Sequence, residues 1–149
     1  MEKDNNSYEK ALKEVKKKNA DIKKVLFLLE KSIKKGNPEA AYALWTWYFY
    51  GKHVKRNMKK AITLLRQAVK HNLPEALFDM AVSCEIGNGV KKNLRLSMEY
   101  YMRAAFHGEK QSYYEVGRCY YYGIGATKNR RLAKIWLDYA KNIGFREKE

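Results

Sequence analysis

The side chains that could do chemistry in this chain are three histidines and two cysteines, and their spacing assembles no reactive group. His71 and His107 stand 36 residues apart, each near the end of an expected helix, where an imidazolium interacts favourably with the helix dipole. His53 has no neighbouring carboxylate or nucleophile to activate. Cys84 and Cys119 have no partner at metal-ligand spacing. We therefore expect no catalytic residues, no metal and no cofactor, and a protein that is not an enzyme.

A repeat of 36 residues runs through most of the chain and decides how its side chains are placed. An apolar residue followed by glycine occurs three times at this interval, as Tyr50-Gly51, Ile86-Gly87 and Tyr122-Gly123. Asparagine and alanine keep the same interval, at Asn57, Asn93 and Asn129 and at Ala68, Ala104 and Ala140. A fixed period of this length indicates stacked copies of one supersecondary unit, an architecture that mostly presents binding surfaces.

Each period encodes two helices, here called helix A and helix B. In the first copy Pro38 suits the first turn of helix A, and Gly51 suits its left-handed end. Asn57 can cap helix B, which ends at Asn72, where later copies have glycine. Apolar residues between these boundaries recur every three or four positions, the spacing of a buried helical stripe. The sequence therefore predicts an all-α solenoid of helix-turn-helix repeats.

The first copy also carries a family resemblance. Its residues 44–68 follow the pattern Leu44-x3-Tyr48-x2-Gly51-x2-Val54-x2-Asn57-x3-Ala61-x2-Leu64-x3-Ala68. This pattern resembles the Sel-one-like repeat, a relative of the tetratricopeptide repeat, and two further copies keep its register up to residue 144. The resemblance implies a right-handed α-solenoid used as an adaptor or scaffold, often in bacteria. Trp45 stands where the family prefers a small residue, which puts the helix packing of the first repeat in question.

The register divides the chain into a cap, three repeats and a tail. The cap is a degenerate half repeat, and its helix B is expected at 22–35. No Pro- or Ser-rich linker interrupts the chain, so we expect one structural domain. The expected boundaries are 1–36 for the cap, 37–72, 73–108 and 109–144 for the repeats, and 145–149 for the charged tail.

The apolar segments and the cysteines of the chain indicate its cellular location. The chain has no early apolar stretch like a signal peptide and no run long enough to span a membrane, so we expect a cytoplasmic protein. Cys84 and Cys119 lie one residue out of phase in neighbouring A helices, and no repeat has the paired cysteines of a disulfide framework. We expect two buried, reduced thiols.

The net charge is +15, and cations gather where helix A turns into helix B. At the three turns these are Lys55, Arg56 and Lys59, then Lys91, Lys92 and Arg95, then Lys128 and Arg131. Stacking by period would align them along one edge, here called the basic ridge. Two interpretations stay open: a ridge that attracts an acidic partner, and ordinary solvated charge in a lysine-rich chain.

In the families that the motif resembles, helix A lines the concave face. By register, the positions of this groove are Tyr42, Thr46, Phe49, Tyr50, Phe78, Val82, Tyr114, Arg118, Tyr121 and Tyr122. Some of these rings are needed for packing between helices, yet tyrosine is also favoured at binding hot spots. We predict that Tyr42, Phe49, Tyr114 and Tyr121 are at least partly exposed.

The last helix B carries an apolar strip where earlier copies are polar. Ile135, Tyr139 and Ile143 take the positions that Glu99, Arg103 and His107 hold one period earlier. Either Phe145 and the tail fold over part of this end strip, or the strip docks onto a partner protein or onto a second copy in a homodimer. We favour docking, because exposed apolar patches usually mark interfaces.

Together these features predict a non-enzymatic protein-binding module that acts as an adaptor, scaffold or inhibitor. Its partner is expected to be an acidic protein, and a sharper version makes the chain an immunity protein against an acidic toxin or effector. The alternative is a nucleic-acid-binding repeat protein that uses the ridge for phosphates and the tyrosines for stacking. Against this alternative, we expect aromatics and cations to lie on different surfaces, and arginine is scarce beside lysine.

Overall fold

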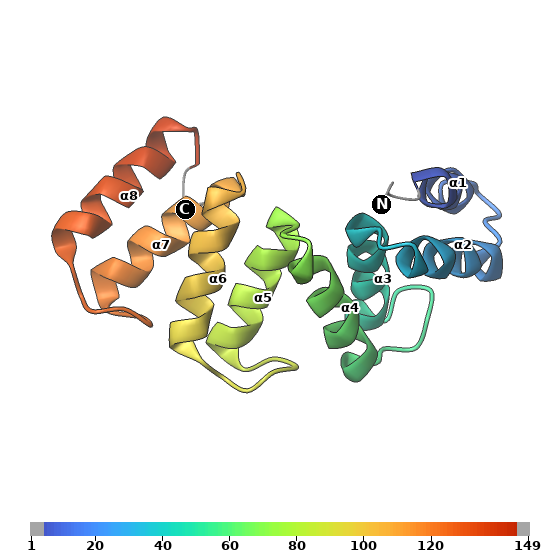
Figure 1. Ribbon diagram of the computed structural model, residues 1–149, viewed down its shortest axis with the longest axis horizontal. Helices are drawn as coiled ribbons and strands as arrows, with labels where there is room; N and C mark the ends of the chain where they lie inside the picture. Colours follow the sequence, from blue (N-terminus) through green and yellow to red (C-terminus); the bar gives the residue numbers. More distant parts are fainter. Residues whose placement is uncertain (1–4, 146–149) are drawn as a thin grey trace. The chain divides into compact units, whose positions relative to one another are not determined.

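Helices make up all the regular structure of residues 5–145, the part of the chain that a computed structural model describes (Figure 1). Successive helices form the pairs α1–α2, α3–α4, α5–α6 and α7–α8. Within residues 5–145, no helix is both long and apolar enough to cross a membrane. The helices are α1 (Asn5–Val15), α2 (Ile22–Lys34), α3 (Pro38–Tyr50), α4 (Met58–Lys70), α5 (Pro74–Ile86), α6 (Leu94–Phe106), α7 (Lys110–Tyr122) and α8 (Arg130–Asn142).

Asparagine caps begin the B helices of the three repeats at the predicted positions. Oδ1 of Asn57 accepts a hydrogen bond from the backbone nitrogen of Lys60 at 3.0 Å. The backbone N–H of Asn57 donates to the carbonyl of Tyr48 in helix A at 2.9 Å. Asn93 and Asn129 repeat both bonds. Each asparagine thus caps one helix and ties the turn back to the other.

The helices fall into two compact units, with the boundary between His71 and Asn72. The first unit contains α1 to α4 and the second contains α5 to α8. Each unit has a hydrophobic cluster of its own. That the chain forms one structural domain stays a prediction.

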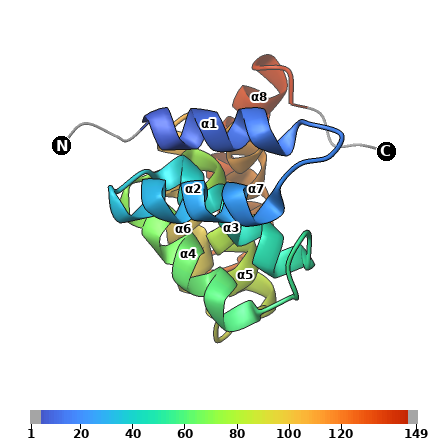
Figure 2. The ribbon, with the colours of Figure 1, turned by 90° about the vertical axis from the view of Figure 1, so that its right-hand side faces the viewer.

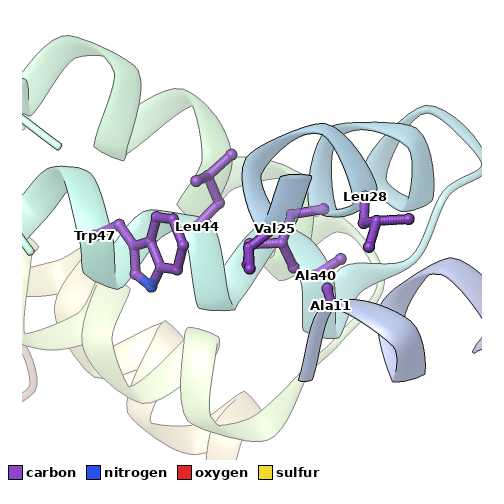
Figure 3. Packing of buried hydrophobic residues seen from close by; sticks show 7 residues of the cluster. Ala11, Val25, Leu28, Ala40, Leu44 and Trp47 are labelled. Carbon is purple, nitrogen blue, oxygen red and sulfur yellow. The ribbon is translucent and has the colours of Figure 1, made fainter. Parts of the chain in front are cut away.

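The core of the first unit joins α1, α2 and α3. One buried cluster contains Ala11 of α1, Val25 and Leu28 of α2, and Leu44 and Trp47 of α3 (Figure 3). In Figure 2, α1 runs alongside α2 in the opposite direction. The segment before the first repeat therefore forms a helix pair, and α2 lies where helix B of the cap was predicted.

Trp45 is accommodated inside the first repeat. Its side chain is buried and stacks on Tyr42, with the ring centroids 5.1 Å apart. The later repeats have Ala81 and Gly117 in this register, and a Cβ on Gly117 would lie 2.7 Å from Leu137 on the facing helix. The first repeat therefore packs around a ring where the third relies on close helix approach. Among the described residues, the buried indole nitrogen of Trp45 has no hydrogen-bond partner, which is a cost of this arrangement.

The core of the second unit is built around Tyr101 of α6, which is buried. Tyr101 and Met98 pack against Val116 and Cys119 of α7. Both cysteines, Cys84 and Cys119, are buried, as predicted, and no disulfide joins them in the structure. Burial raises the pKa of the Cys119 thiol to about 12, so this sulfur stays protonated at neutral pH.

The last helix differs from α6 on the face that α6 turns toward α7. Met98 and Met102 of α6 pack in the cluster that α6 shares with α7. One period later, α8 has Lys134 and Asp138 at these positions. Both side chains are exposed and form an ion pair of 2.6 Å. The face that is apolar and packed in α6 is therefore charged and solvated in α8.

Candidate binding surfaces

The last residue of helix A in each repeat presents a large apolar side chain to solvent. Tyr50, Ile86 and Tyr122 end α3, α5 and α7, and they are 70%, 63% and 66% exposed. Each is followed by a glycine with φ of 69°, 74° and 72°, a left-handed conformation that glycine adopts without strain. The turn from helix A to helix B thus begins at an exposed apolar residue.

A cation lies against each of these cap glycines. A Cβ added to the glycine would stand 3.3, 3.2 and 3.4 Å from the Cβ atoms of Arg56, Lys92 and Lys128. All three cations are exposed. Each repeat therefore places one exposed apolar residue and one exposed cation around the same glycine. We call these combinations the turn pairs: Tyr50 with Arg56, Ile86 with Lys92, and Tyr122 with Lys128.

Within the second unit, the turn of the third repeat lies against the start of α6. A Cβ added to Gly125 would overlap the carbonyl oxygen of Leu94 and stand 3.1 Å from the backbone nitrogen of Arg95. This backbone contact brings the third turn beside the start of α6. An alignment along one edge stays a prediction for the cations of the two turns. They are all exposed: Lys91, Lys92, Arg95, Lys128 and Arg131. In the first unit, the turn residues Lys55, Arg56 and Lys59 are exposed as well.

Cations lie over aromatic rings at two of the turns, whereas the sequence led us to expect aromatics and cations on different surfaces. Arg130, the first residue of α8, lies over the ring of Tyr121 with its guanidinium carbon 4.2 Å from the centroid. Lys60 lies over Tyr48 at 5.2 Å. The turns bring the start of helix B back to the end of helix A, which places these groups side by side.

The predicted groove residues are all accessible in part. Tyr42, Phe49, Tyr114 and Tyr121 are partly exposed, as predicted, and so are Thr46, Phe78, Val82 and Arg118. Tyr50 and Tyr122 are exposed. The rings also pack on one another, with Tyr114 lying 5.4 Å from Phe145 between centroids. Their part in binding stays a prediction.

Arg118 is held by carboxylates of its own unit. Its Nη2 donates to Glu85 at 2.8 Å and its Nε donates to Glu115 at 2.6 Å. The hydroxyl of Tyr101 donates to the same Glu85 carboxylate at 2.8 Å. Burial alone would raise the pKa of Glu85, but the bonds from Arg118 and Tyr101 outweigh it and lower that pKa. The guanidinium therefore organises the groove surface and is not a spare cation for a partner.

Charge is segregated between the A helices and the turns. The A helices of the repeats contain only two basic residues, Lys110 and Arg118. Their acidic residues are Glu39, Glu75, Asp79, Glu85 and Glu115. The net positive charge of the repeats is therefore carried by the turns and the B helices.

The end strip is exposed and belongs to a larger aromatic cluster of the second unit. Ile135 and Tyr139 are 58% and 50% exposed, and Ile143 is half-buried. Tyr139 packs on Tyr113, at 4.9 Å between centroids. Tyr113 in turn packs on Trp136, which contacts the 73% exposed Phe106.

Sequence reasoning missed the three further members of this cluster, Phe106, Tyr113 and Trp136. A signal existed, because Phe106 takes the position of Lys34 and Lys70 on the same face of the earlier B helices. Phe145, which could have folded over the end strip, packs on Tyr114 of α7. The rest of the tail lies outside the described residues.

The histidines occupy structural positions. His53 packs on Trp47 with 4.7 Å between ring centroids. His71 and His107 stand at the C-caps of α4 and α6. Across residues 5–145, no three His, Cys, Asp or Glu side chains are grouped so that they could hold a metal ion.

A comparison with protein families matches the model of the Sel1 repeat to residues 38–73, 74–108 and 110–144, which is most of the chain. The chain belongs to the Sel1 repeat family. The resemblance and the all-α solenoid class predicted from the sequence are thereby confirmed. Sel1 repeats are generally non-catalytic scaffolds for protein–protein interaction.

Solved structures share this fold. A Sel1 repeat protein from Oxalobacter formigenes is 35% identical, with a TM-score of 0.76 over 80% of this chain and 90% of its own. The antigen c5321, present in uropathogenic Escherichia coli strains and displaying an SLR fold, is 25% identical with a TM-score of 0.79. That match covers 85% of this chain but only 27% of c5321. No curated protein matches the chain.

Proposed function

We propose that this Sel1 repeat protein binds an acidic protein partner through the basic ridge and the turn pairs. The observation that carries the proposal is the recurrence of an exposed apolar residue beside a cation in each repeat, from Tyr50 with Arg56 to Tyr122 with Lys128. Apolar anchors supply binding free energy, and flanking cations select and steer a partner of opposite charge. An acidic segment with interspersed apolar residues complements this surface.

The charge segregation supports contact at the turns. The A-helix surface carries carboxylates such as Glu75 and Glu115, which would repel an acidic partner that lay along its whole length. Groove residues near the turns, such as Phe49 and Tyr121, are better placed to contribute. The partner is therefore expected to centre on the ends of the A helices.

A finer version of the proposal concerns the role. The chain would act in the bacterial cytoplasm as an inhibitor or immunity protein that covers an acidic toxin or effector. Its support is the bacterial origin of the similar Sel1 and SLR proteins. An adaptor or scaffold role uses the same surface and differs in whether a third protein joins the complex.

The end strip is proposed as a second contact for the same acidic partner. Arg131 lies one helical turn before Ile135 of the strip, and Lys110 lies one turn before Tyr113 of the adjoining cluster, so cations flank this apolar surface. A homodimer through this strip would instead bring the same cations of two copies together. Charge complementarity therefore favours the acidic partner.

Nucleic-acid binding is a second candidate, because Arg130 and the ring of Tyr121 stand together. Sites for single-stranded nucleic acid often combine an aromatic side chain with an arginine in this way. Ile86, at the centre of the three turn pairs in sequence, argues against it because an aliphatic side chain offers no flat face for a base. Tight, saturable binding of a single-stranded oligonucleotide at physiological salt would favour this candidate over the protein partner.

The decisive experiment compares two charge reversals of equal size. The native partner is identified by cross-linking and mass spectrometry, and its affinity is measured by calorimetry. Lys92→Glu with Lys128→Glu reverses two of the five ridge cations of the second unit, the two that belong to turn pairs. Lys16→Glu with Lys18→Glu changes net charge equally in the exposed turn between α1 and α2. We expect only the ridge variant to lose affinity for the partner. Equal losses of affinity in both variants would mean that net charge alone matters, and would overturn the proposal.

A further inference from the structure

The first unit contains two adjoining hollows on the surface formed by α2, α3 and α4. The larger has a volume of about 750 Å³, and Leu44, Tyr48 and Leu64 are among its apolar lining residues. The smaller measures about 310 Å³ and shares Ile33 and Lys34 with the larger. Because they share these residues, we treat them as one feature, the α2–α4 hollow.

The second unit has aromatic rings at the corresponding positions. They come from α6, α7 and α8, and they are Phe106, Tyr113, Trp136 and Tyr139. Their centroids lie 6.3, 5.9 and 4.9 Å apart in successive contacts. Two periods earlier the chain has Lys34, Ala41, Leu64 and Gln67, and each of these lines the hollow.

The comparison within one chain shows what kind of group this place accommodates. In the second unit, the indole of Trp136 lies between rings from two other helices and packs on the core cluster of α6 and α7. In the first unit, Leu64 is much smaller, and the partly exposed Ile33 and Tyr48 are left with apolar surface facing the hollow. An incoming aromatic side chain would bury that surface as Trp136 does in its own unit.

The charges around the hollow specify the segment that carries such a ring. Lys34, Lys59 and Lys60 line the larger part, with Glu30 as its one acidic lining residue. Lys70 and His71 line the smaller part. Lys60 already lies over the ring of Tyr48. Carboxylates on both sides of the incoming ring would meet these ammonium groups at the rim.

From these observations, and resting on the proposed function of binding an acidic protein, we propose that the α2–α4 hollow receives an aromatic side chain from an acidic segment of the partner. In the first unit the hollow is a pocket for a partner's side chain, whereas the second unit fills the same place with its own rings. A second copy of the chain fits less well, because the cations beside its exposed rings would face the lysines of the hollow.

The test fills the hollow with a ring of the protein's own. Leu64→Trp copies the second unit, and Arg66→Trp places the same ring on the same helix at an exposed position that does not line the hollow. The probe is a fluorescein-labelled peptide Asp-Glu-Trp-Glu-Asp, followed by anisotropy, with a peptide carrying Ala for Trp as its control. Amide chemical shifts of ¹⁵N-labelled protein show where the peptide binds.

We expect the Trp peptide to bind and to shift the amides of Ile33 and Leu64. Leu64→Trp should weaken binding about tenfold or more, because burial of one aromatic side chain accounts for at least that factor. Arg66→Trp should bind within about twofold of the wild type, since one exposed charge near a site contributes little. The affinity of the wild type for the Ala peptide should be no higher than the affinity of Leu64→Trp for the Trp peptide.

Three results would overturn the proposal: equal binding by Leu64→Trp, equal binding of both peptides, or shifts confined to α6–α8. Self-association of the wild type that Leu64→Trp abolishes would identify a second copy as the occupant instead. If Leu64→Trp does not fold, Lys34→Phe, which copies Phe106, replaces it in the same comparison. The ridge variant Lys92→Glu with Lys128→Glu leaves the hollow intact, so a failure here is distinguishable from a failure of the ridge proposal.

Discussion

Arg130 lies over Tyr121, with its guanidinium carbon 4.2 Å from the ring centroid and its Nη1 donating to the phenol oxygen at 3.2 Å. Arg130 is also the first residue of α8, where a cation opposes the helix dipole. The ring therefore holds an arginine at a position that helix stability alone would not select. This relationship joins a groove ring to a cation that stands between Lys128 and Arg131 of the basic ridge in the sequence.

Arg130→Ala is expected to leave the fold intact and to weaken the partner complex. Loss of an exposed cation–π contact costs roughly 0.5–1 kcal/mol, and relief at the helix start offsets part of it. The association rate should fall and depend less on salt, measured by stopped-flow fluorescence. Lys134→Ala, an exposed cation on the same helix that pairs with Asp138, is the control and should change little. Equal effects from both variants would contradict the prediction.

Gly125→Ala is expected to destabilise the second unit more than Gly144→Ala. Both glycines have positive φ, at 68° and 89°, so both substitutions strain the backbone. Only at Gly125 would the new Cβ also overlap Leu94, whereas nothing lies within 4 Å of Gly144. The overlap should add about 1–3 kcal/mol to the loss, measured by urea unfolding. Equal losses would mean that the third turn does not rest on the start of α6.

Glu85→Gln is expected to flatten the acid limb of the stability profile. The folded protein holds the pKa of Glu85 below its ordinary value of 4.5, so the carboxylate contributes stability above that pH. This contribution is lost as pH falls through the lowered folded pKa. Urea unfolding between about pH 7 and pH 3 should show a smaller decline for Glu85→Gln than for the wild type. Glu75→Gln, at an exposed carboxylate on the same helix, is the matched control variant.

Ile135→Glu with Tyr139→Arg copies the second repeat and is expected to separate folding from association. The pair of changes should cost about 0.5–1.5 kcal/mol, because Tyr139 loses its contact with Tyr113 while Ile135 is already exposed. Partner binding through the end strip should be lost, as measured by calorimetry and sedimentation. A variant that unfolds would show that the strip belongs to the core of the protein.

The helices and their boundaries could be predicted because local chemistry sets them. Asn57 forms its cap bond with Lys60 three residues along, and Gly51 ends its helix through its own backbone conformation. Because these residues recur every 36 positions, the helix boundaries of the later repeats could be predicted from those of the first. The packing of Trp45 was less predictable, because the room for its ring depends on side chains beyond its own motif.

The surfaces were harder to read because they join residues from several helices. Arg130 meets Tyr121 only because the turn folds back, with Asn129 bonded to the carbonyl of Tyr120. The aromatic cluster around Trp136 contains side chains from three helices. The α2–α4 hollow lies where the first unit has smaller or polar residues in place of those rings. A periodic sequence pattern reports what each helix buries, and it does not report which side chains meet across turns.

The ion pair between Lys134 and Asp138 limits how the array can grow. A further repeat stacked on α8 as α7 is stacked on α6 would have to strip water from both charges, which is costly without new partners. A repeat added in that geometry would therefore need polar groups that pair with Lys134 and Asp138. Lengthening the protein by engineering calls for extra copies inserted ahead of the third repeat, where the methionines of α6 supply a face that accepts a neighbour.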